Sequence, residues 1–231
     1  MDIQEETYKL LAQRLFSYFD SKKLVDWAVM MMENNYDSDS LVILAGLDSD
    51  STEVREQYFW QTIDELKLNV KKSDFDLIDH YAVYVAESVI SKMISPKKGL
   101  SIMQEIVQAT DYSDKYIHFF ELDEDLDYLK YDNQTIFNSG LSLQNSDKFI
   151  IREFELFLDA EKFKIDDTVK ELAYCNSCSS IGKPKLKTKR NLIGQVKYQY
   201  WVCYLCESKD ILHFRDQKGR EIILNKIKNA T

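Results

Sequence analysis

The chain has 231 residues, 45% of them hydrophobic, which is enough for one sizeable domain and a small appendage. No apolar run approaches the ~20 residues of a membrane span, and the first residues, MDIQEETYKLL, lack the basic start and apolar stretch of a signal peptide. We therefore expect a cytoplasmic protein without a membrane partner.

The net charge of −9 is unevenly distributed along the chain. Residues 170–231 hold 13 Lys and Arg against 5 Asp and Glu, so this part is near +8. Residues 1–169 hold 17 against 34 and are near −17. Such asymmetry is typical of proteins that bind charged partners. Here the two parts would attract partners of opposite charge, or would attract each other.

Apolar residues spaced by three and four predict amphipathic helices over most of residues 1–165. The first two stripes run from Tyr8 to Phe19 and from Leu24 to Met31, and a short apolar segment covers 40–47. Asp50, with Glu53 three residues later, is a predicted N-cap for the next helix.

The same spacing continues to residue 165. Ser73 or Asp74 opens a long helix, and Pro96 either ends it or begins the next one. An irregular acidic stretch follows from 111 to 140, and Asn145 or Ser146 caps a last strong helix. Short links between helices predict a bundle or irregular array.

The pattern changes after Leu172 to the alternation of strands. We expect strands in KPKLKTKRNLIGQVKYQYWVC, in ILHF and in EIIL, the last two joined by a hairpin turn at Asp216–Gly219. The predicted fold is mainly α, with an acidic α-helical domain at 1–168 and a small basic β-rich module at 169–231.

The strongest signal is a pair of C-x₂-C motifs separated by 24 residues: Cys175, Cys178, Cys203 and Cys206. Each motif places two thiolates on one tight turn, and two such turns give the closed tetrahedral site that structural Zn²⁺ prefers. Four thiolates leave no position for water, so we expect one structural zinc ion. Ordinary buried or redox cysteine pairs, and an iron–sulfur cluster, are the alternatives.

From Tyr174 to about Ile227 the chain resembles the zinc ribbons of transcription, translation and regulatory proteins. Ribbon motifs often have Pro inside the cysteine pair or Gly after it, whereas CNSCSS and CYLCES have neither. This departure bears on the particular ribbon family and not on the metal.

Basic and aromatic residues between the two motifs are candidates for contact with nucleic acid or another partner. In an extended segment, the alternate lysines Lys183, Lys185, Lys187 and Lys189 point to one face, with Arg190 and Lys197 nearby. Tyr198, Tyr200 and Trp201 could stack on bases. Alternatively, the lysines protect an exposed hairpin from aggregation, and the aromatic residues cover the metal site.

We expect no enzymatic activity. His80, His118 and His213 are far apart in sequence and lie in no recognised metal or nucleophile motif, and no P-loop, nucleophile elbow, HExxH or dinucleotide fingerprint occurs. An acidic run without the calcium-loop pattern indicates a solvated surface or an interface for a basic protein. The candidate residues are Asp111, Glu121, Asp123, Glu124, Asp125, Asp127 and Asp132.

The segments 41–68, 81–107 and 119–129 resemble a family of bacterial helical proteins associated with immunity to polymorphic toxins. The resemblance implies a protein that neutralises a basic toxin by binding and occluding it, with the ribbon stiffening or extending the binding surface. The other hypothesis is a nucleic-acid-associated regulator, in which the ribbon binds the nucleic acid and the helices recruit a partner or dimerise.

Overall fold

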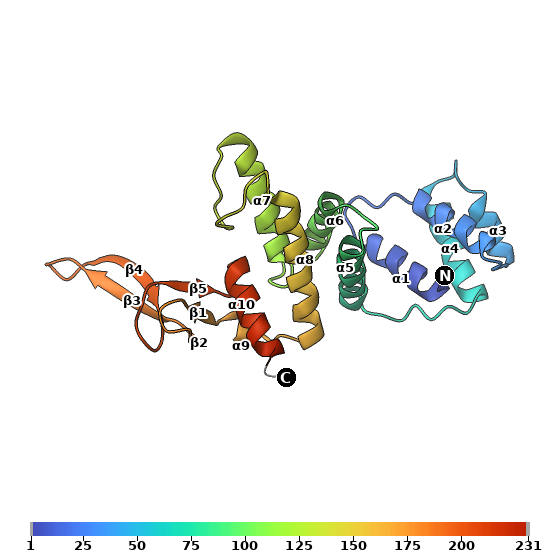
Figure 1. Cartoon of the computed structure of the whole chain (residues 1–231). Helices are drawn as coiled ribbons and strands as arrows, with labels where there is room; N and C mark the ends of the chain where they lie inside the picture. The colour runs from blue at the N-terminus through green and yellow to red at the C-terminus, as the bar shows by residue number, and fades with distance from the viewer. Residues whose placement is uncertain (1, 230–231) are drawn as a thin grey trace. The chain divides into compact units, whose positions relative to one another are not determined.

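The computed structural model describes residues 2–229, and the chain is mainly α, as predicted. The described residues form ten helices and five strands, and the strands all lie in the C-terminal part (Figure 1). None of the described helices is long and apolar enough to cross a bilayer.

The chain divides into two compact units, and the divisions fall inside α5 (Asp74–Ile90) and α6 (Pro96–Ala109). The first unit runs to Val85 and includes Ser101–Tyr116. The second comprises Ala86–Leu100 and the residues from Ile117 onward. The boundary expected at 168 and 169 stays a prediction.

The first unit is helical. Besides its parts of α5 and α6, it contains α1 (Ile3–Gln13), α2 (Lys22–Glu33), α3 (Asp39–Ala45) and α4 (Thr52–Glu65). Its core includes Leu24, Leu41 and Phe59, all fully buried. The helix predicted from Asp50 exists, but Ser51 is its N-cap, because the Ser51 hydroxyl accepts the Val54 N–H.

The second unit contains α7 (Ile117–Tyr131), α8 (Ser146–Phe163) and α9 (Asp167–Lys170), followed by the strands and α10 (Gln217–Lys228). The prediction of an irregular stretch at 111–140 was wrong over α7. Leu122, Leu126 and Leu129 line the buried side of this helix, but the many acidic residues between them obscured the helical period.

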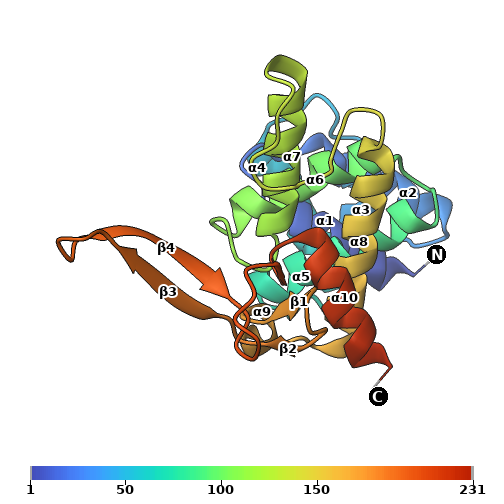
Figure 2. The ribbon, with the colours of Figure 1, turned by 60° about the vertical axis from the view of Figure 1, so that its left-hand side comes forward.

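Two antiparallel sheets form the β module (Figure 2). The first has the order β2-β1-β5, made of β1 (Ala173–Cys175), β2 (Ile181–Gly182) and β5 (Ile211–His213). The second is a hairpin of β3 (Lys185–Arg190) and β4 (Val196–Val202), which projects from the first sheet.

The expected strand at EIIL was wrong, because residues 217–228 form α10. Arg220, Ile223, Leu224 and Ile227 are spaced as one helix face, and Ile223 and Leu224 are fully buried. They form a small core with Leu156 of α8 and Phe214. The ribbon therefore packs directly on a helix of its own unit.

Gly219 has a packing role and is not part of a hairpin turn. A Cβ at this position would lie 2.1 Å from the backbone oxygen of His213. Only glycine allows the first turn of α10 to approach the end of β5 so closely.

Candidate metal centre

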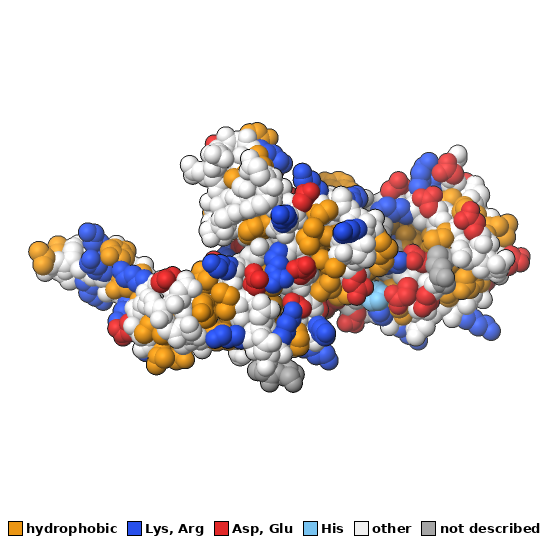
Figure 3. Space-filling model, in the orientation of Figure 1, with side chains coloured by type: hydrophobic (Ala, Val, Ile, Leu, Met, Phe, Trp, Pro, Cys, Tyr) orange, Lys and Arg blue, Asp and Glu red, His pale blue; other side chains and the backbone are white. Residues whose placement is uncertain are grey.

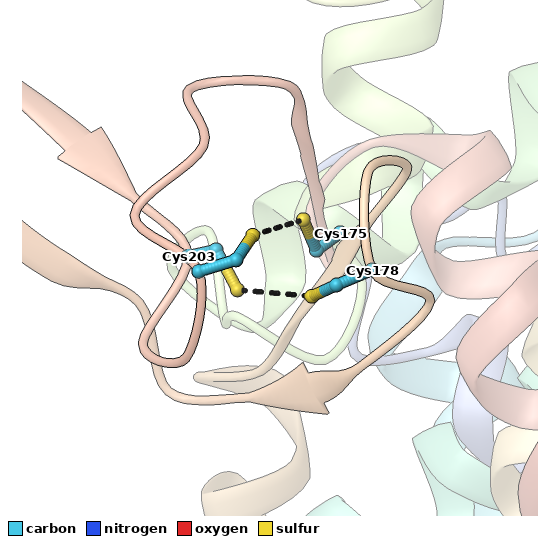
Figure 4. Close-up of side chains that lie close together, drawn as sticks. Cys175, Cys178 and Cys203 are labelled. Atoms are coloured by element: carbon cyan, nitrogen blue, oxygen red, sulfur yellow. Dashed lines mark hydrogen bonds between the residues drawn. The ribbon is translucent and has the colours of Figure 1, made fainter.

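The four cysteines converge at the ends of two strands (Figure 4). Cys175 is the last residue of β1, and Cys203 directly follows β4. Their Sγ atoms, with those of Cys178 and Cys206, all lie within 4.8 Å of one another. Residues from two separate strands therefore form one cluster, as the spacing predicted.

The sulfur separations match a tetrahedral metal site. Cys175 Sγ lies 3.6 Å from Cys206 Sγ, and Cys178 Sγ lies 3.7 Å from Cys203 Sγ. Four sulfurs at about 2.3 Å from one Zn²⁺ would be about 3.8 Å apart in a regular tetrahedron. All four cysteines are free, so the cluster has the donor set and the size of a structural S₄ site.

The two cysteine turns have the same backbone hydrogen bonds. Cys175 N–H donates to the Ser180 carbonyl at 3.0 Å, and Cys203 N–H donates to the Ser208 carbonyl at 2.8 Å. The return bonds run from the Ser179 N–H to Cys175 and from the Glu207 N–H to Cys203. Each motif thus builds a tight knuckle that fixes both of its thiols.

Ser179 and Glu207 have φ values of 57° and 60°, in the left-handed region. They directly follow Cys178 and Cys206, where many ribbons have glycine. Both knuckles therefore keep the usual conformation without glycine, at the cost of backbone strain in Ser179 and Glu207.

Replacement of the strained Ser179 by glycine is expected to stabilise the ribbon. We expect Ser179→Gly to raise the free energy of unfolding by about 0.5–1 kcal/mol, because relief of left-handed strain exceeds the added freedom of the unfolded chain. Chemical denaturation of the full chain measures the change. Ser177→Gly, at an exposed position without positive φ, is the control and should destabilise.

Hydrogen bonds give the thiols unequal acidity. The Ser180 hydroxyl and the backbone N–H groups of Cys206 and Leu205 lower the pKa of Cys203 to about 6. The Ser208 N–H favours the Cys206 thiolate, but the contact with Cys178, burial, and the contacts with Cys175 and Cys203 together outweigh this and raise the pKa of Cys206 to about 12. Four thiolates cannot coexist here unless a cation neutralises them, which is the property of a metal site.

The hairpin presents lysines and tyrosines on one face. Lys187 lies opposite Tyr200, and Lys189 lies opposite Tyr198. Because opposite residues in an antiparallel pair point to the same side, these side chains alternate on that face together with Lys185. The rings of Tyr198 and Tyr200 are 5.7 Å apart, and Lys209 Nζ lies 4.2 Å from the centre of the Tyr200 ring.

Lys183 and Trp201 lie elsewhere. Lys183 precedes β3 and pairs with Glu171, so it does not share the alternation of the strand. Trp201 lies opposite Leu186, on the other face of the hairpin. Both residues line an open pocket of about 610 Å³ with His213. Arg190 and Lys197 are exposed near a register shift at Lys189 and Arg190.

Two of the expected acidic interface residues are buried, so their assignment to a surface was wrong. Glu121 is 4% exposed and Asp125 is 0% exposed. Asp125 accepts hydrogen bonds from the backbone N–H groups of Ile136, Phe137 and Asn138 and so folds the loop after α7 back onto the helix. Glu121 binds the side chain of Arg215.

The other five acidic candidates are at least partly accessible. Asp111, Asp127 and Asp132 are exposed, and Asp123 and Glu124 are half-buried. Burial, then the negative charges of Asp127 and Glu124, raise the pKa of Asp123 even though Lys130 opposes them. Their role as a partner interface stays a prediction.

A buried ion pair joins the ribbon to α8, and the sequence analysis missed it. Arg220 of α10 donates to both carboxylate oxygens of Glu153 at 2.7 Å, and also to the carbonyls of Phe214 and Arg215. Burial alone would raise the pKa of Glu153, but Arg220 and a hydrogen bond from Gln217 hold it below its ordinary value. The only signal in the sequence was Glu153 itself, three residues after Ile150 and next to Phe154 on an apolar stripe.

The three histidines do not belong to the cysteine cluster within residues 2–229. His80 pairs with Glu5 in the first unit, and His213 contacts the Trp201 ring. Burial, and then the charge of Arg220, lower the pKa of His118. His118 is therefore a neutral member of the buried polar group around Glu153.

Comparison with protein-family models, with curated proteins and with solved structures gives no match to this chain. The zinc-ribbon resemblance has the support of the cysteine geometry. The resemblance of the helical part to immunity proteins rests on its sequence pattern alone.

Proposed function

We propose that the four cysteines hold one structural Zn²⁺ and that the β3–β4 hairpin binds nucleic acid. The observation that carries the proposal is the alternation of Lys187 and Lys189 with Tyr198 and Tyr200 on one face of the hairpin, where Lys189 and Tyr198 are exposed and the other two are half-buried. Lysines bind phosphates, and tyrosines either donate their hydroxyls to phosphate oxygens or stack on unpaired bases.

The charge of the hairpin supports an anionic ligand. Residues 183–206 contain six Lys and Arg and no Asp or Glu. On the face that carries the lysines and tyrosines, the Lys–Tyr face, Lys187 forms an ion pair with Glu207 of the second knuckle. A polyanion that lies along the hairpin is attracted by several of these Lys and Arg side chains at once.

The metal site supports the hairpin at its base. β4 runs directly into Cys203, and β3 follows the first knuckle after β2 and two linking residues. Zn²⁺ neutralises the thiolates and crosslinks the two knuckles when bound. The crosslinked knuckles then hold both strands in one register and direction. The lysines and tyrosines are therefore in place before the ligand binds.

Reversal of the hairpin charge tests the proposal. We expect Lys185→Glu/Lys187→Glu/Lys189→Glu to weaken binding of a fluorescent oligonucleotide by about tenfold to a hundredfold at low salt and to lower the salt slope by about three. Fluorescence anisotropy of the full chain across a salt series measures both. Lys92→Glu/Lys97→Glu/Lys98→Glu, at three exposed lysines off the hairpin, gives the same change in net charge. An equal loss in this control, or no binding by the unchanged protein, contradicts the proposal.

A second proposal is inhibition of a basic toxin domain by the acidic helices. The net charge of residues 1–169, near −17, and the exposure of Asp127 and Asp132 support it, because they would attract a basic partner. Inhibition of a toxin encoded beside this chain, weakened by Asp127→Lys/Asp132→Lys, would support this function. Full inhibition by that variant would exclude this surface.

A further inference from the structure

The tip of the β3–β4 hairpin exposes two large apolar side chains. Leu192 is fully exposed and Ile193 is 78% exposed. Single exposed apolar residues are common, but Leu192 and Ile193 are adjacent and are the two most exposed large aliphatic side chains within residues 2–229, an arrangement that favours aggregation. Their position therefore calls for a partner that covers them.

The backbone of this tip is ordered by Asn191. The Asn191 side chain accepts the N–H groups of Ile193 and Gln195, and its carbonyl accepts the Gly194 N–H at 3.0 Å. Asn at the first position and Gly at the fourth, with a φ of 84° at Gly194, are typical of a type I turn that leads back into a hairpin. The turn thus holds Leu192 and Ile193 at its two corners.

Cations surround the apolar tip. Lys189 and Arg190 precede it, Lys197 follows it, and Arg190 also donates to the Gly194 carbonyl at 2.9 Å. Figure 3 shows the end of the hairpin, at the far left, as hydrophobic side chains bordered by Lys and Arg. An apolar wedge with basic flanks fits a ligand that has a charged exterior and an apolar interior.

We propose that Leu192 and Ile193 form a wedge that inserts between stacked base pairs, so that the nucleic acid bound by the hairpin is a duplex. This inference rests on the proposed function and adds the class of ligand. Apolar side chains inserted between base steps unstack them and kink the duplex. Two-stranded β-ribbons also enter the grooves of a duplex, including the minor groove, where such wedges act.

A lipid surface is the other ligand with a charged exterior and an apolar interior. The length of the Lys–Tyr alternation favours a nucleic acid over a lipid surface. β3 has six residues and is therefore about 20 Å long, and the alternation continues from Lys189 back to Lys185. A polymer that lies along the hairpin meets all of these groups, whereas a membrane that contacts the tip meets only the nearest, since its field falls off within about 10 Å.

The test uses the full chain and a short duplex with 2-aminopurine beside a central TA step, because such steps unstack easily. We expect binding to increase the 2-aminopurine fluorescence. We expect Leu192→Ser/Ile193→Ser to abolish this increase and to weaken binding about fivefold, while the salt slope stays unchanged. Met93→Ser/Ile136→Ser removes two comparably exposed apolar side chains off the hairpin and should behave as the unchanged protein.

The outcomes separate the two proposals. Salt-dependent binding without a fluorescence increase, or an increase that the tip variant retains, overturns the wedge and leaves nucleic-acid binding in place. Binding to single strands but not to a duplex also overturns the wedge and leaves nucleic-acid binding in place. Absence of any salt-dependent binding overturns the proposed function itself. Retention of the protein on phosphatidylserine vesicles, lost in the tip variant, assigns the tip to a membrane and overturns the wedge.

Discussion

Removal of the metal is expected to unfold the ribbon. Its strands are two to seven residues long, and its buried apolar residues are few: Phe214, Ile223 and Leu224 against Leu156, with Ala173 and Val202 in the strands. Such a small core does not fold reliably alone, and structural zinc contributes about 10–16 kcal/mol of apparent free energy in comparable modules. Hydrogen exchange of the full chain, before and after chelation, should show loss of amide protection in β1, β4 and β5.

Cys203→Ser is expected to have the same effect, because a serine hydroxyl would replace one of the four thiolate ligands. Leu205→Ser is the matched control, since Leu205 lies inside the same knuckle and its side chain is exposed. It should retain both the metal and the amide protection. Protected β1 and β4 amides in the chelated protein would show that the module does not depend on metal.

Loss of the Glu153–Arg220 pair is the second large effect. We expect Arg220→Met to lower the free energy of unfolding of the second unit by about 3–5 kcal/mol, because it leaves a carboxylate buried without its partner. Urea denaturation followed by tryptophan fluorescence and circular dichroism measures this loss. The double variant Glu153→Leu/Arg220→Met should recover most of it, since neither charge then remains buried.

The matched control is Arg152→Met, next to Glu153 on the same helix. Arg152 pairs with Glu155 and Glu221 near the surface, so its loss should cost less than about 1 kcal/mol. An equal cost at both positions would contradict the assignment of the buried pair as the main link between α8 and α10.

The same pair predicts a pH dependence. The pKa of Glu153 in the folded protein lies below its ordinary value of 4.5. Its contribution to stability is therefore fully present above that value and is lost as the pH falls toward the folded pKa. The unchanged protein should therefore lose stability relative to Glu153→Leu/Arg220→Met as the pH falls from 6 to 3, which denaturation at each pH measures.

The clustering of the four cysteines could be predicted because its information is local. Each C-x₂-C motif forms one knuckle, and the left-handed conformation of Ser179 and Glu207 shows that the knuckle forms even without the usual glycine. The two strands between the motifs could also be predicted, because residues 185–202 alternate, but their register, with Lys187 opposite Tyr200, could not.

The errors arose where packing overrides local pattern. Asp216–Gly219 has the composition of a turn, but Gly219 is required by the approach of α10 to His213. Glu121 and Asp125 lie in an acidic run, yet they are four residues apart on the side of α7 that carries Leu122 and Leu126. Glu153 and Arg220 are 67 residues apart, and no local pattern pairs them.

The most direct test is measurement of the metal and its ligands in the full chain, purified without chelator. We predict one Zn²⁺ per chain by elemental analysis, and zinc X-ray absorption that shows four sulfur neighbours at about 2.3 Å. Protein that is folded with protected β1 and β4 amides but contains no zinc, or zinc with nitrogen or oxygen neighbours, would contradict the metal-held ribbon on which this account rests.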